Sequence, residues 1–292
     1  MFSGCLVALV TPFRKDGSLD EPGLRKNIGF LLKNKVTGLV PCATTGEAPC
    51  LSDEEYKRVI RIALYAGRGR VKIVPGAGTN STKKTIVLVQ RAKRLGVDGC
   101  LVVTPYYNRP TQEGLYAHFR AVAEAVSIPI IIYNVPGRTG VNILPKTVRR
   151  LAEDCGNIVG IKEASGNLDQ VSELIRICGA DFAVLSGDDS LTLPMLALGA
   201  KGVISVIGNI LPKETSEMVE FYLNGKEDKA RTIHLKLFPL MKALFMETNP
   251  VPLKQAMNLL RMPAGSPRLP LVPMSKENVR ALREELDRLR LV

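Results

Sequence analysis

The chain has 292 residues, of which 46% are hydrophobic and 23% are charged, the composition of an ordinary globular protein. Its net charge of +12 is spread over many predicted helix faces without a basic motif that contains aromatic residues, which argues against nucleic-acid binding. We expect the excess charge to form a solvated basic surface that attracts small anionic substrates. No apolar run is long enough to cross a membrane, so no membrane partner is expected.

The six cysteines are widely separated, and none of them forms a C-x-x-C pair. The two histidines do not cluster with them, so the spacing typical of a metal site is absent. We therefore expect neither a metal nor a cofactor. The cysteines are interpreted as small core residues of a protein in the reducing cytoplasm.

Apolar runs of strand length alternate with amphipathic helical segments along the chain. Strands are predicted at 6–12, 38–45, 71–75, 100–105, 128–135, from 158 to Lys162, at 182–186 and at 202–207. Helices are predicted at 22–34, 52–66, 81–95, 112–126, 168–178 and 212–223, and a further one begins at Pro145. Ser52 followed by Glu55 predicts a capping box at the start of the second helix.

The strands are nearly continuous apolar runs, as expected when both faces of a parallel sheet are buried. Eight βα units within about 225 residues predict an α/β protein with a (β/α)8 TIM barrel at 1–225. A doubly wound sheet is the alternative, but no G-x-G-x-x-G follows the first strand. The rest of the chain, 226–292, is predicted to be a helical region packed on the barrel, with helices at 226–245, 251–260 and 275–289.

Lys162 is predicted to lie where the sixth strand ends. Burial of an ammonium group costs several kcal/mol unless it is paired or loses its proton. A lysine that loses its proton easily is a nucleophile that forms a Schiff base with a carbonyl substrate. Lys162 could equally be the first solvated residue of a loop, so the other strand ends have to decide between the two interpretations.

Polar residues follow several of the other predicted strands. Because the active site of a TIM barrel lies at the carboxyl ends of its strands, we expect these residues to converge. The group comprises Thr44, Thr45, Tyr106, Tyr107, Tyr133, Arg138 and Gly187. Hydroxyl groups can relay the protons that imine chemistry moves, and Arg138 can bind a carboxylate with two hydrogen bonds. Together with Lys162 they predict a class I aldolase-type lyase that acts on an α-keto acid.

Seven motifs extend this pattern over essentially the whole chain. They are Ala43-Thr-Thr-Gly-Glu47, Gly76-Ala-Gly-Thr-Asn80, Thr104-Pro-Tyr-Tyr-Asn-Arg-Pro110, Tyr133-Asn-Val-Pro-Gly-Arg-Thr-Gly140, Gly160-Ile-Lys-Glu-Ala164, Leu185-Ser-Gly-Asp-Asp189 and Asn249-Pro-Val-Pro252. With these motifs the sequence resembles the dihydrodipicolinate synthase family, in the N-acetylneuraminate lyase superfamily of pyruvate-dependent class I aldolases. The resemblance implies a homotetramer, built as a dimer of dimers.

The resemblance also implies a role for each site residue. Lys162 would form the Schiff base with pyruvate, assisted by Tyr133. Thr44 would link Tyr133 to Tyr107 of another subunit in a proton relay. The substrate-binding residues would be Thr45, Ile204 and Gly187 for pyruvate and Arg138 for the carboxylate of aspartate semialdehyde. The implied reaction is condensation of the two to 4-hydroxy-tetrahydrodipicolinate, in the diaminopimelate route to lysine.

Two alternatives stay open. The chain could be a sister enzyme, a lyase of N-acetylneuraminate or of keto-deoxy sugar acids; Arg138 argues against it, because this residue suits a short substrate with a distal carboxylate. It could also be a non-catalytic binding protein on the same barrel, because a fold does not fix a function. Loss of the lysine or of a tyrosine would indicate the latter, and Lys162, Tyr107 and Tyr133 are all present.

The chain departs from the family pattern at Ala43, where the family usually has glycine. A methyl group there would crowd the turn if the backbone needed a positive φ, but we expect it to be tolerated. A second departure concerns feedback inhibition by lysine. Asn80 and Tyr106 match an allosteric lysine site at the dimer interface, whereas Lys84 stands near the position of an acidic residue and would repel the ligand. We therefore predict weak or absent inhibition, and replacement of two histidines by Asp53 and Tyr56 points the same way.

Overall fold

Eight short parallel strands form one sheet in the computed structural model, which describes residues 2–292. The strands are β1 (Gly4–Ala8), β2 (Gly38–Val40), β3 (Lys72–Ile73), β4 (Cys100–Val103), β5 (Ile130–Asn134), β6 (Ile158–Glu163), β7 (Ala183–Ser186) and β8 (Gly202–Ser205). The order in the sheet is β3-β2-β1-β8-β7-β6-β5-β4, so the first and last strands of the chain are neighbours. Between β3 and β4 the ring closes through Leu101, whose N–H donates to Pro75 O and whose carbonyl accepts from Ala77 N, each at 2.9 Å. The predicted TIM barrel is confirmed.

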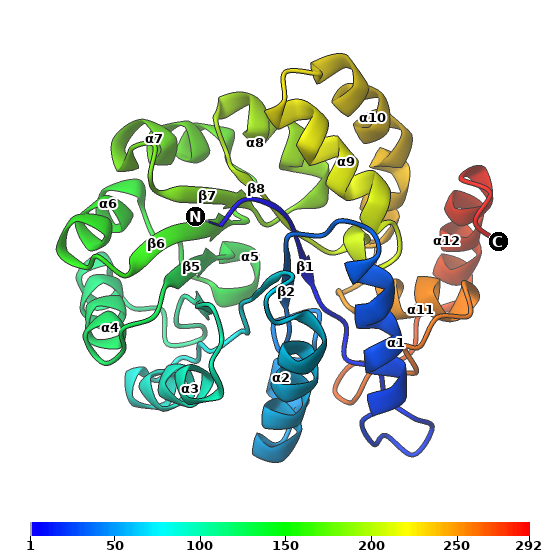
Figure 1. The fold of residues 1–292 in the computed structure, drawn as a ribbon, viewed down its shortest axis with the longest axis horizontal. Coiled ribbons are helices and arrows are strands. Elements are labelled where there is room, and N and C mark those ends of the chain that lie inside the picture. The colour runs from blue at the N-terminus through cyan, green and yellow to red at the C-terminus, as the bar shows by residue number, and fades with distance from the viewer. Residues whose placement is uncertain (1) are drawn as a thin grey trace.

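Helices surround the sheet on its outer side (Figure 1). They are α1 (Glu21–Leu32), α2 (Asp53–Gly67), α3 (Thr82–Leu95), α4 (Gln112–Glu124), α6 (Pro145–Asp154), α7 (Leu168–Cys178), α8 (Thr192–Leu198) and α9 (Pro212–Leu223). The predicted capping box is present: Ser52 Oγ accepts from Glu55 N at 3.2 Å, and Glu55 Oε2 accepts from Ser52 N at 2.9 Å. Such a cap is worth about 1 kcal/mol, because it satisfies N–H groups that the first helical turn leaves free. Pro145 is the first residue of α6, as predicted.

The core has an outer and an inner layer on the two sides of the sheet. Along β5, Ile130 and Ile132 belong to the outer layer, which packs against the helices, while Ile131 and Tyr133 belong to the inner layer inside the barrel. Successive side chains of a strand point to opposite faces, so a strand buried on both faces is apolar throughout. This explains the uninterrupted apolar runs and places Tyr133 inside the barrel.

Several strands end earlier than the sequence predicts, and one ends later. β2 stops at Val40, because Pro41 has no N–H to donate and Cys42 adopts a left-handed φ of +54°. β8 gives way to the 3-10 helix η3 (Ile207–Asn209). β6 continues to Glu163, so Lys162 lies within the strand and the loop interpretation is wrong. Four short helices were not predicted from the sequence: α5 (Pro136–Thr139), α8 and the 3-10 helices η1 (Ala48–Cys50) and η2 (Asp189–Leu191).

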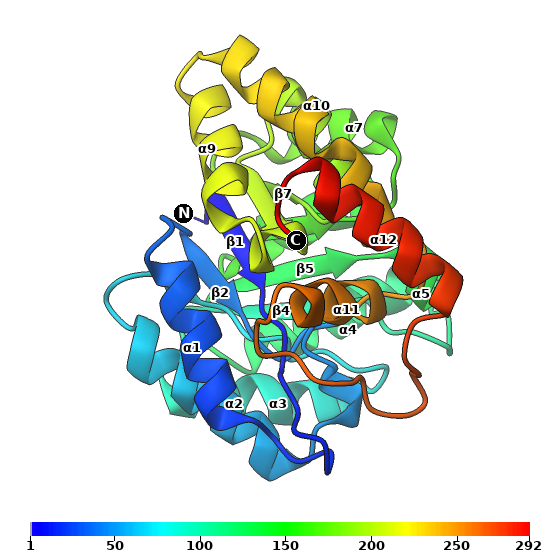
Figure 2. The same ribbon diagram turned by 90° about the vertical axis from the view of Figure 1, so that its right-hand side faces the viewer.

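The C-terminal helices α10 (Glu227–Ala243), α11 (Val251–Leu259) and α12 (Lys276–Arg288) lie on one side of the barrel, near α1 and α9 (Figure 2). The connection after α11 is tied to the start of the chain. Asn27 Nδ2 donates to Pro263 O at 2.7 Å, and Phe13 N donates to Ala264 O at 3.1 Å. None of the described helices has the length and apolar character that a membrane crossing needs. The division into a barrel at 1–225 and a helical region at 226–292 stays our prediction.

Candidate active site

Lys162 on β6 and Tyr133 on β5 are register partners in neighbouring strands. Their side chains therefore lie on the same inner face of the barrel. The Lys162 Nζ atom is 4.4 Å from the centre of the Tyr133 ring, and both residues are buried, with exposed fractions of 4% and 6%. The amine therefore lies over the face of the Tyr133 ring, and both side chains are largely shielded from bulk water.

Gly187, which follows β7, provides the space for the lysine. A Cβ atom at this position would lie 3.0 Å from Lys162 Cε and 2.7 Å from the Ala164 side chain. The Gly187 N–H donates to Glu163 O at 2.8 Å and so holds this backbone against β6. A larger residue would have to displace the lysine side chain.

The turn after β2 carries Thr44 and Thr45. It begins at Cys42, with φ of +54°, and ends at Glu47, with φ of +53°. Thr45 is almost fully buried, at 1% exposed, whereas Thr44 is half-buried. The left-handed backbone falls on Cys42 and not on Ala43, so the alanine meets no strain from a positive φ.

A cavity of about 640 Å³, called the lysine cavity below, opens at the carboxyl ends of the strands. It is lined by six residues that the sequence analysis assigned to the site: Thr44, Thr45, Tyr133, Arg138, Lys162 and Gly187. Arg138 comes from α5 and is exposed, and its Nη2 donates to Asn249 O at 3.2 Å. One wall of the cavity consists of Phe245 to Asn249, from the segment that joins α10 to α11.

Two of the predicted catalytic and substrate-binding residues do not line this cavity. Tyr107 is 89% exposed and does not line the lysine cavity, so one chain alone does not bring its hydroxyl to Lys162. Ile204 on β8 is fully buried in the inner layer, where it pairs with Leu6 on β1. Its side chain is therefore core, and only its backbone is a candidate for substrate contact.

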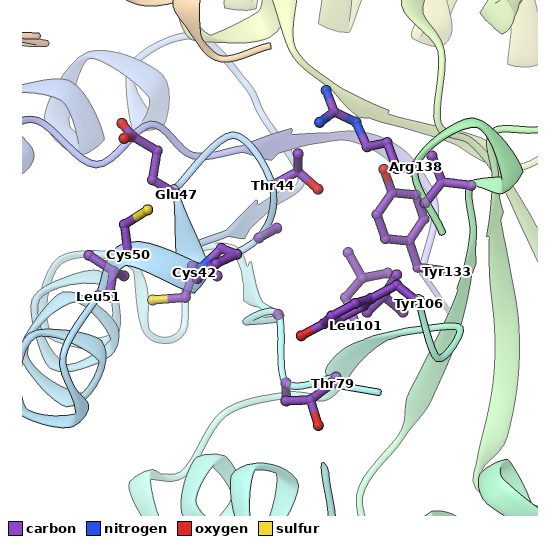
Figure 3. A pocket seen from close by; sticks show the side chains of 18 of the residues that line it. Cys42, Thr44, Glu47, Cys50, Leu51, Thr79, Leu101, Tyr106, Tyr133 and Arg138 are labelled. Atoms are coloured by element: carbon purple, nitrogen blue, oxygen red, sulfur yellow. The ribbon is translucent and has the colours of Figure 1, made fainter. Parts of the chain in front are cut away.

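A second cavity of about 500 Å³, the side cavity, shares part of its lining with the first. Figure 3 shows residues that line the side cavity. The two cavities share Thr44, Tyr133 and Arg138, and Figure 3 shows the Thr44 hydroxyl on the side that faces Tyr133. Of the three residues predicted for an allosteric lysine site, Tyr106 lines the side cavity, whereas Asn80 and Lys84 do not. Lys84 lies exposed in the first turn of α3.

The model of the dihydrodipicolinate synthetase family matches residues 1–289. The chain belongs to this family. It is 53% identical over 292 residues to the 4-hydroxy-tetrahydrodipicolinate synthase of Methanocaldococcus jannaschii, and the match covers 100% of both chains. Among solved structures, it is similar to dihydrodipicolinate synthase from Aquifex aeolicus, with 49% identity, 99% of each chain covered and a TM-score of 0.97. The enzyme from Cyanidioschyzon merolae, solved with lysine bound, is 40% identical with a TM-score of 0.97 over 100% of this chain and 99% of that chain.

Two residues that the sequence analysis left without a role support the site of this family member. Asn249 is 4% exposed, and its Nδ2 donates to Thr45 Oγ1 at 3.0 Å. Asp189 accepts from Val206 N and Ile207 N, each at 2.9 Å, which fixes the backbone after β8; burial raises the pKa of this carboxyl group. Both residues stood within the quoted motifs, which was the available signal, but the contacts span distant segments and sequence alone does not reveal them.

Proposed function

We propose that this lyase condenses pyruvate with aspartate 4-semialdehyde to 4-hydroxy-tetrahydrodipicolinate, in the diaminopimelate route to lysine. The observation that carries the proposal is the buried Lys162 amine, which faces Tyr133 in a cavity that also contains Arg138. The full-length similarity to relatives that bear the name of this activity supports the choice of substrates.

The Lys162 amine attacks the keto carbon of pyruvate, and loss of water gives an imine. Removal of a methyl proton converts the imine to an enamine, whose carbon attacks the aldehyde of the second substrate. The substrate's own amine then displaces Lys162 from the imine carbon, which closes the ring and frees the lysine. Tyr133, next to the reacting nitrogen, donates and accepts the protons that these steps move.

Each substrate carries a carboxylate, and the cavity offers separate groups for the two. Thr45, the backbone at Ile204 and Gly187 bind pyruvate close to Lys162. Arg138 binds the carboxylate of aspartate semialdehyde at the cavity mouth. One guanidinium N–H is used on Asn249 O, which leaves the others free for a carboxylate.

Thr44 connects Tyr133 to Tyr107 of a second copy of the chain and completes the proton relay. The position of Tyr107 supports this assignment: the side chain is 89% exposed and lines neither cavity, so a second copy of the chain would have to bring its hydroxyl to Thr44. We propose a homotetramer arranged as a dimer of dimers. The six cysteines are all free, which supports a location in the reducing cytoplasm.

The test is to incubate the protein with pyruvate, reduce with borohydride and locate the adduct by peptide mass. An adduct at Lys162 is expected, and Lys162→Ala is the control. Absence of any adduct would overturn Schiff-base chemistry, and an adduct on another lysine would move the nucleophile. Consumption of aspartate semialdehyde should exceed that of N-acetylneuraminate or keto-deoxy sugar acids; the reverse would make the chain a sister enzyme.

A further inference from the structure

Asn134 and Glu163 form the next register pair after Tyr133 and Lys162 on β5 and β6. Since side chains alternate along a strand, this pair lies on the outer face of the sheet while the reactive pair lies inside. The Asn134 Nδ2 donates to Glu163 Oε2 at 2.9 Å. Both residues are buried, with exposed fractions of 0% and 2%.

Every hydrogen bond to the Glu163 carboxylate comes from an N–H donor. Oε1 accepts from Ser165 N at 2.6 Å, and Oε2 accepts from Asn134 and from Gln170 Nε2, the latter at 3.0 Å. Within residues 2–292 this carboxylate forms no ion pair with a Lys, Arg or His side chain. The amides therefore hold a buried negative charge without a cation, which proteins retain only where the hydrogen bonds are complete.

The amides are joined to one another as well. Asn134 Nδ2 also donates to Asn142 Oδ1 at 2.7 Å, and Asn142 Nδ2 donates to Gln170 Oε1 at 2.8 Å. The orientation of the first amide is fixed, because Asn134 Oδ1 accepts from Ile143 N at 3.2 Å. The result is a closed network of Asn134, Asn142, Glu163 and Gln170, called the amide–carboxylate network below.

An apolar cluster in this layer would bury the same space without the desolvation of a charge. Unlike apolar contacts, the hydrogen bonds of the network depend on geometry, because they form only when the ends of β5 and β6 are aligned. The reactive pair inside the barrel shares this alignment, since it lies one residue earlier on the same two strands.

We propose that Glu163 is a positioning residue, which acts through Asn134 to set the placement of Lys162 relative to Tyr133. This inference rests on the proposed function, in which Lys162 forms the Schiff base. A displacement of about 1 Å between reacting groups can cost about 100-fold in rate, so the alignment matters for catalysis.

The first variant is Glu163→Gln, which keeps the side-chain shape but turns an NH2 group against the N–H donors. We expect kcat to fall by about 10- to 100-fold, and the rate of borohydride trapping at saturating pyruvate to fall in parallel. The KM for pyruvate should stay within about threefold, because its carboxylate binds at Thr45, away from the altered face.

Asn157 offers a matched control at the opposite end of β6. Its Nδ2 donates to Ala123 O at 3.0 Å and to Val126 O at 2.9 Å, just before the strand begins at Ile158. Asn157→Ala should lower Tm but leave kcat within about twofold of the wild type. If Glu163→Gln and Asn157→Ala show the same loss of kcat for each degree by which Tm falls, the network only stabilises the fold and the proposal is wrong.

The double variant Glu163→Gln with Asn134→Asp tests the mechanism by exchange. The new amide at 163 donates to the new carboxylate at 134, which still accepts from Ile143 N. If the amides of Asn142 and Gln170 turn over, every bond among the four side chains reforms in the reverse direction. We expect kcat to recover to within about threefold of the wild type; a double variant with native Tm and no recovery would overturn the proposal.

Trapping of the wild-type protein distinguishes a failure of the proposed function from a failure of the positioning role. If the wild type forms no pyruvate adduct at Lys162, the proposed function itself is wrong. If the wild type is trapped there and Glu163→Gln is trapped as fast, only the positioning role fails.

Discussion

The Lys254 Nζ atom lies 2.5 Å from Glu47 Oε1, and both side chains are only 1% exposed. Glu47 ends the turn that carries Thr44 and Thr45, and Lys254 belongs to α11 in the C-terminal region. Burial lowers the pKa of Lys254, and the nearby Glu47 carboxylate opposes that shift. The ion pair therefore connects a wall of the lysine cavity to a segment 207 residues later in the chain.

Arg268 strengthens the same connection. The backbone N–H of Arg268 donates to Glu47 Oε2 at 2.8 Å, and the Arg268 guanidinium pairs with Glu55 at the start of α2. The centre of the Phe13 ring lies 4.1 Å from Lys254 Nζ and 4.0 Å from Arg268 Cζ. Cations over an aromatic face are attracted to it, so the loop after β1 joins the cluster.

Replacement of Lys254 by methionine should destabilise the protein strongly. The change leaves the Glu47 carboxylate buried without its cation, which typically costs about 3–5 kcal/mol. We expect this loss in the free energy of unfolding from urea titration, together with a raised KM for pyruvate. The double variant Lys254→Met with Glu47→Gln should regain much of the stability, because no unpaired charge is left. A single variant within about 1 kcal/mol of the wild type would show that the pair does not hold the turn.

Gly187→Ala should slow Schiff-base formation. The added methyl group would lie 2.7 Å from Ala164 Cβ and 3.0 Å from Lys162 Cε, so the backbone at Gly187 and the lysine side chain both have to shift, and the amine loses its place beside Tyr133. We expect borohydride trapping of pyruvate to slow by about 10-fold or more. Gly29→Ala on α1 is the control: a Cβ atom there meets nothing within 4 Å, and activity should be unchanged. Equal trapping rates in all three proteins would contradict the crowding argument.

Asn249→Ala should raise the KM for pyruvate through Thr45. In the wild type, the Asn249 amide donates to Thr45 Oγ1, so the hydroxyl hydrogen is left to point at another acceptor such as the pyruvate carboxylate. Loss of one such hydrogen bond is worth about 1 kcal/mol, or about fivefold in KM. Thr45→Val should raise KM as well, and the double variant should be no worse than the more damaged single one. Strictly additive effects would mean that the two residues act independently.

Much of the fold is predictable from the sequence because it depends on local signals. The predicted bounds of α7 and α9 agree with the structure, and the capping box and the proline at 145 mark helix starts correctly. Strand ends are less predictable. The apolar run continues past Val40, but Cys42 leaves the sheet with a positive φ that no local pattern indicates.

The site residues at the strand ends can be predicted once the barrel is recognised, but the residues that hold them in place cannot. Lys162, Tyr133 and Arg138 could be assigned to one mouth as soon as eight βα units were recognised. Glu47 and Lys254 form an ion pair although they are far apart in the sequence. No local residue pattern in a single sequence indicates such a contact. Tyr107 lies outside the cavity in one chain, so its predicted role depends on a second copy.

Free lysine should inhibit the protein weakly or not at all. Lys84, which is exposed, was assigned to the effector site from the sequence, and its charge would repel the lysine ammonium. The replacement Lys84→Glu should make any inhibition stronger. Steady-state rates at increasing lysine concentration, with pyruvate near its KM, measure the effect. An inhibition constant in the submillimolar range for the wild type would contradict the prediction.

The stability of the protein should fall as the pH drops from about 6.5 toward 4, in part because of His118. This residue is 5% exposed, its Nδ1 lies 2.9 Å from Thr82 Oγ1, and burial lowers the pKa of its imidazole from 6.5 to about 4. Between these values the unfolded chain binds a proton that the folded protein does not, so protons favour unfolding; below pH 4 both states are protonated and this contribution stops changing. The shift corresponds to at most about 3 kcal/mol.

His118→Gln isolates this contribution, because it keeps a polar partner for Thr82 but cannot titrate. Urea midpoints are measured for the wild type and the variant at several pH values from about 7 to 4. The midpoint of the wild type should fall relative to that of the variant as the pH drops, since only the wild type loses stability through His118. Burial lowers the pKa of His234 as well, so the single variant His234→Gln should also lose less stability than the wild type as the pH falls. Carboxylate titrations are common to all three proteins and cancel in the comparison. Parallel curves for the wild type and His118→Gln would show that the imidazole takes up its proton equally in the folded and unfolded states.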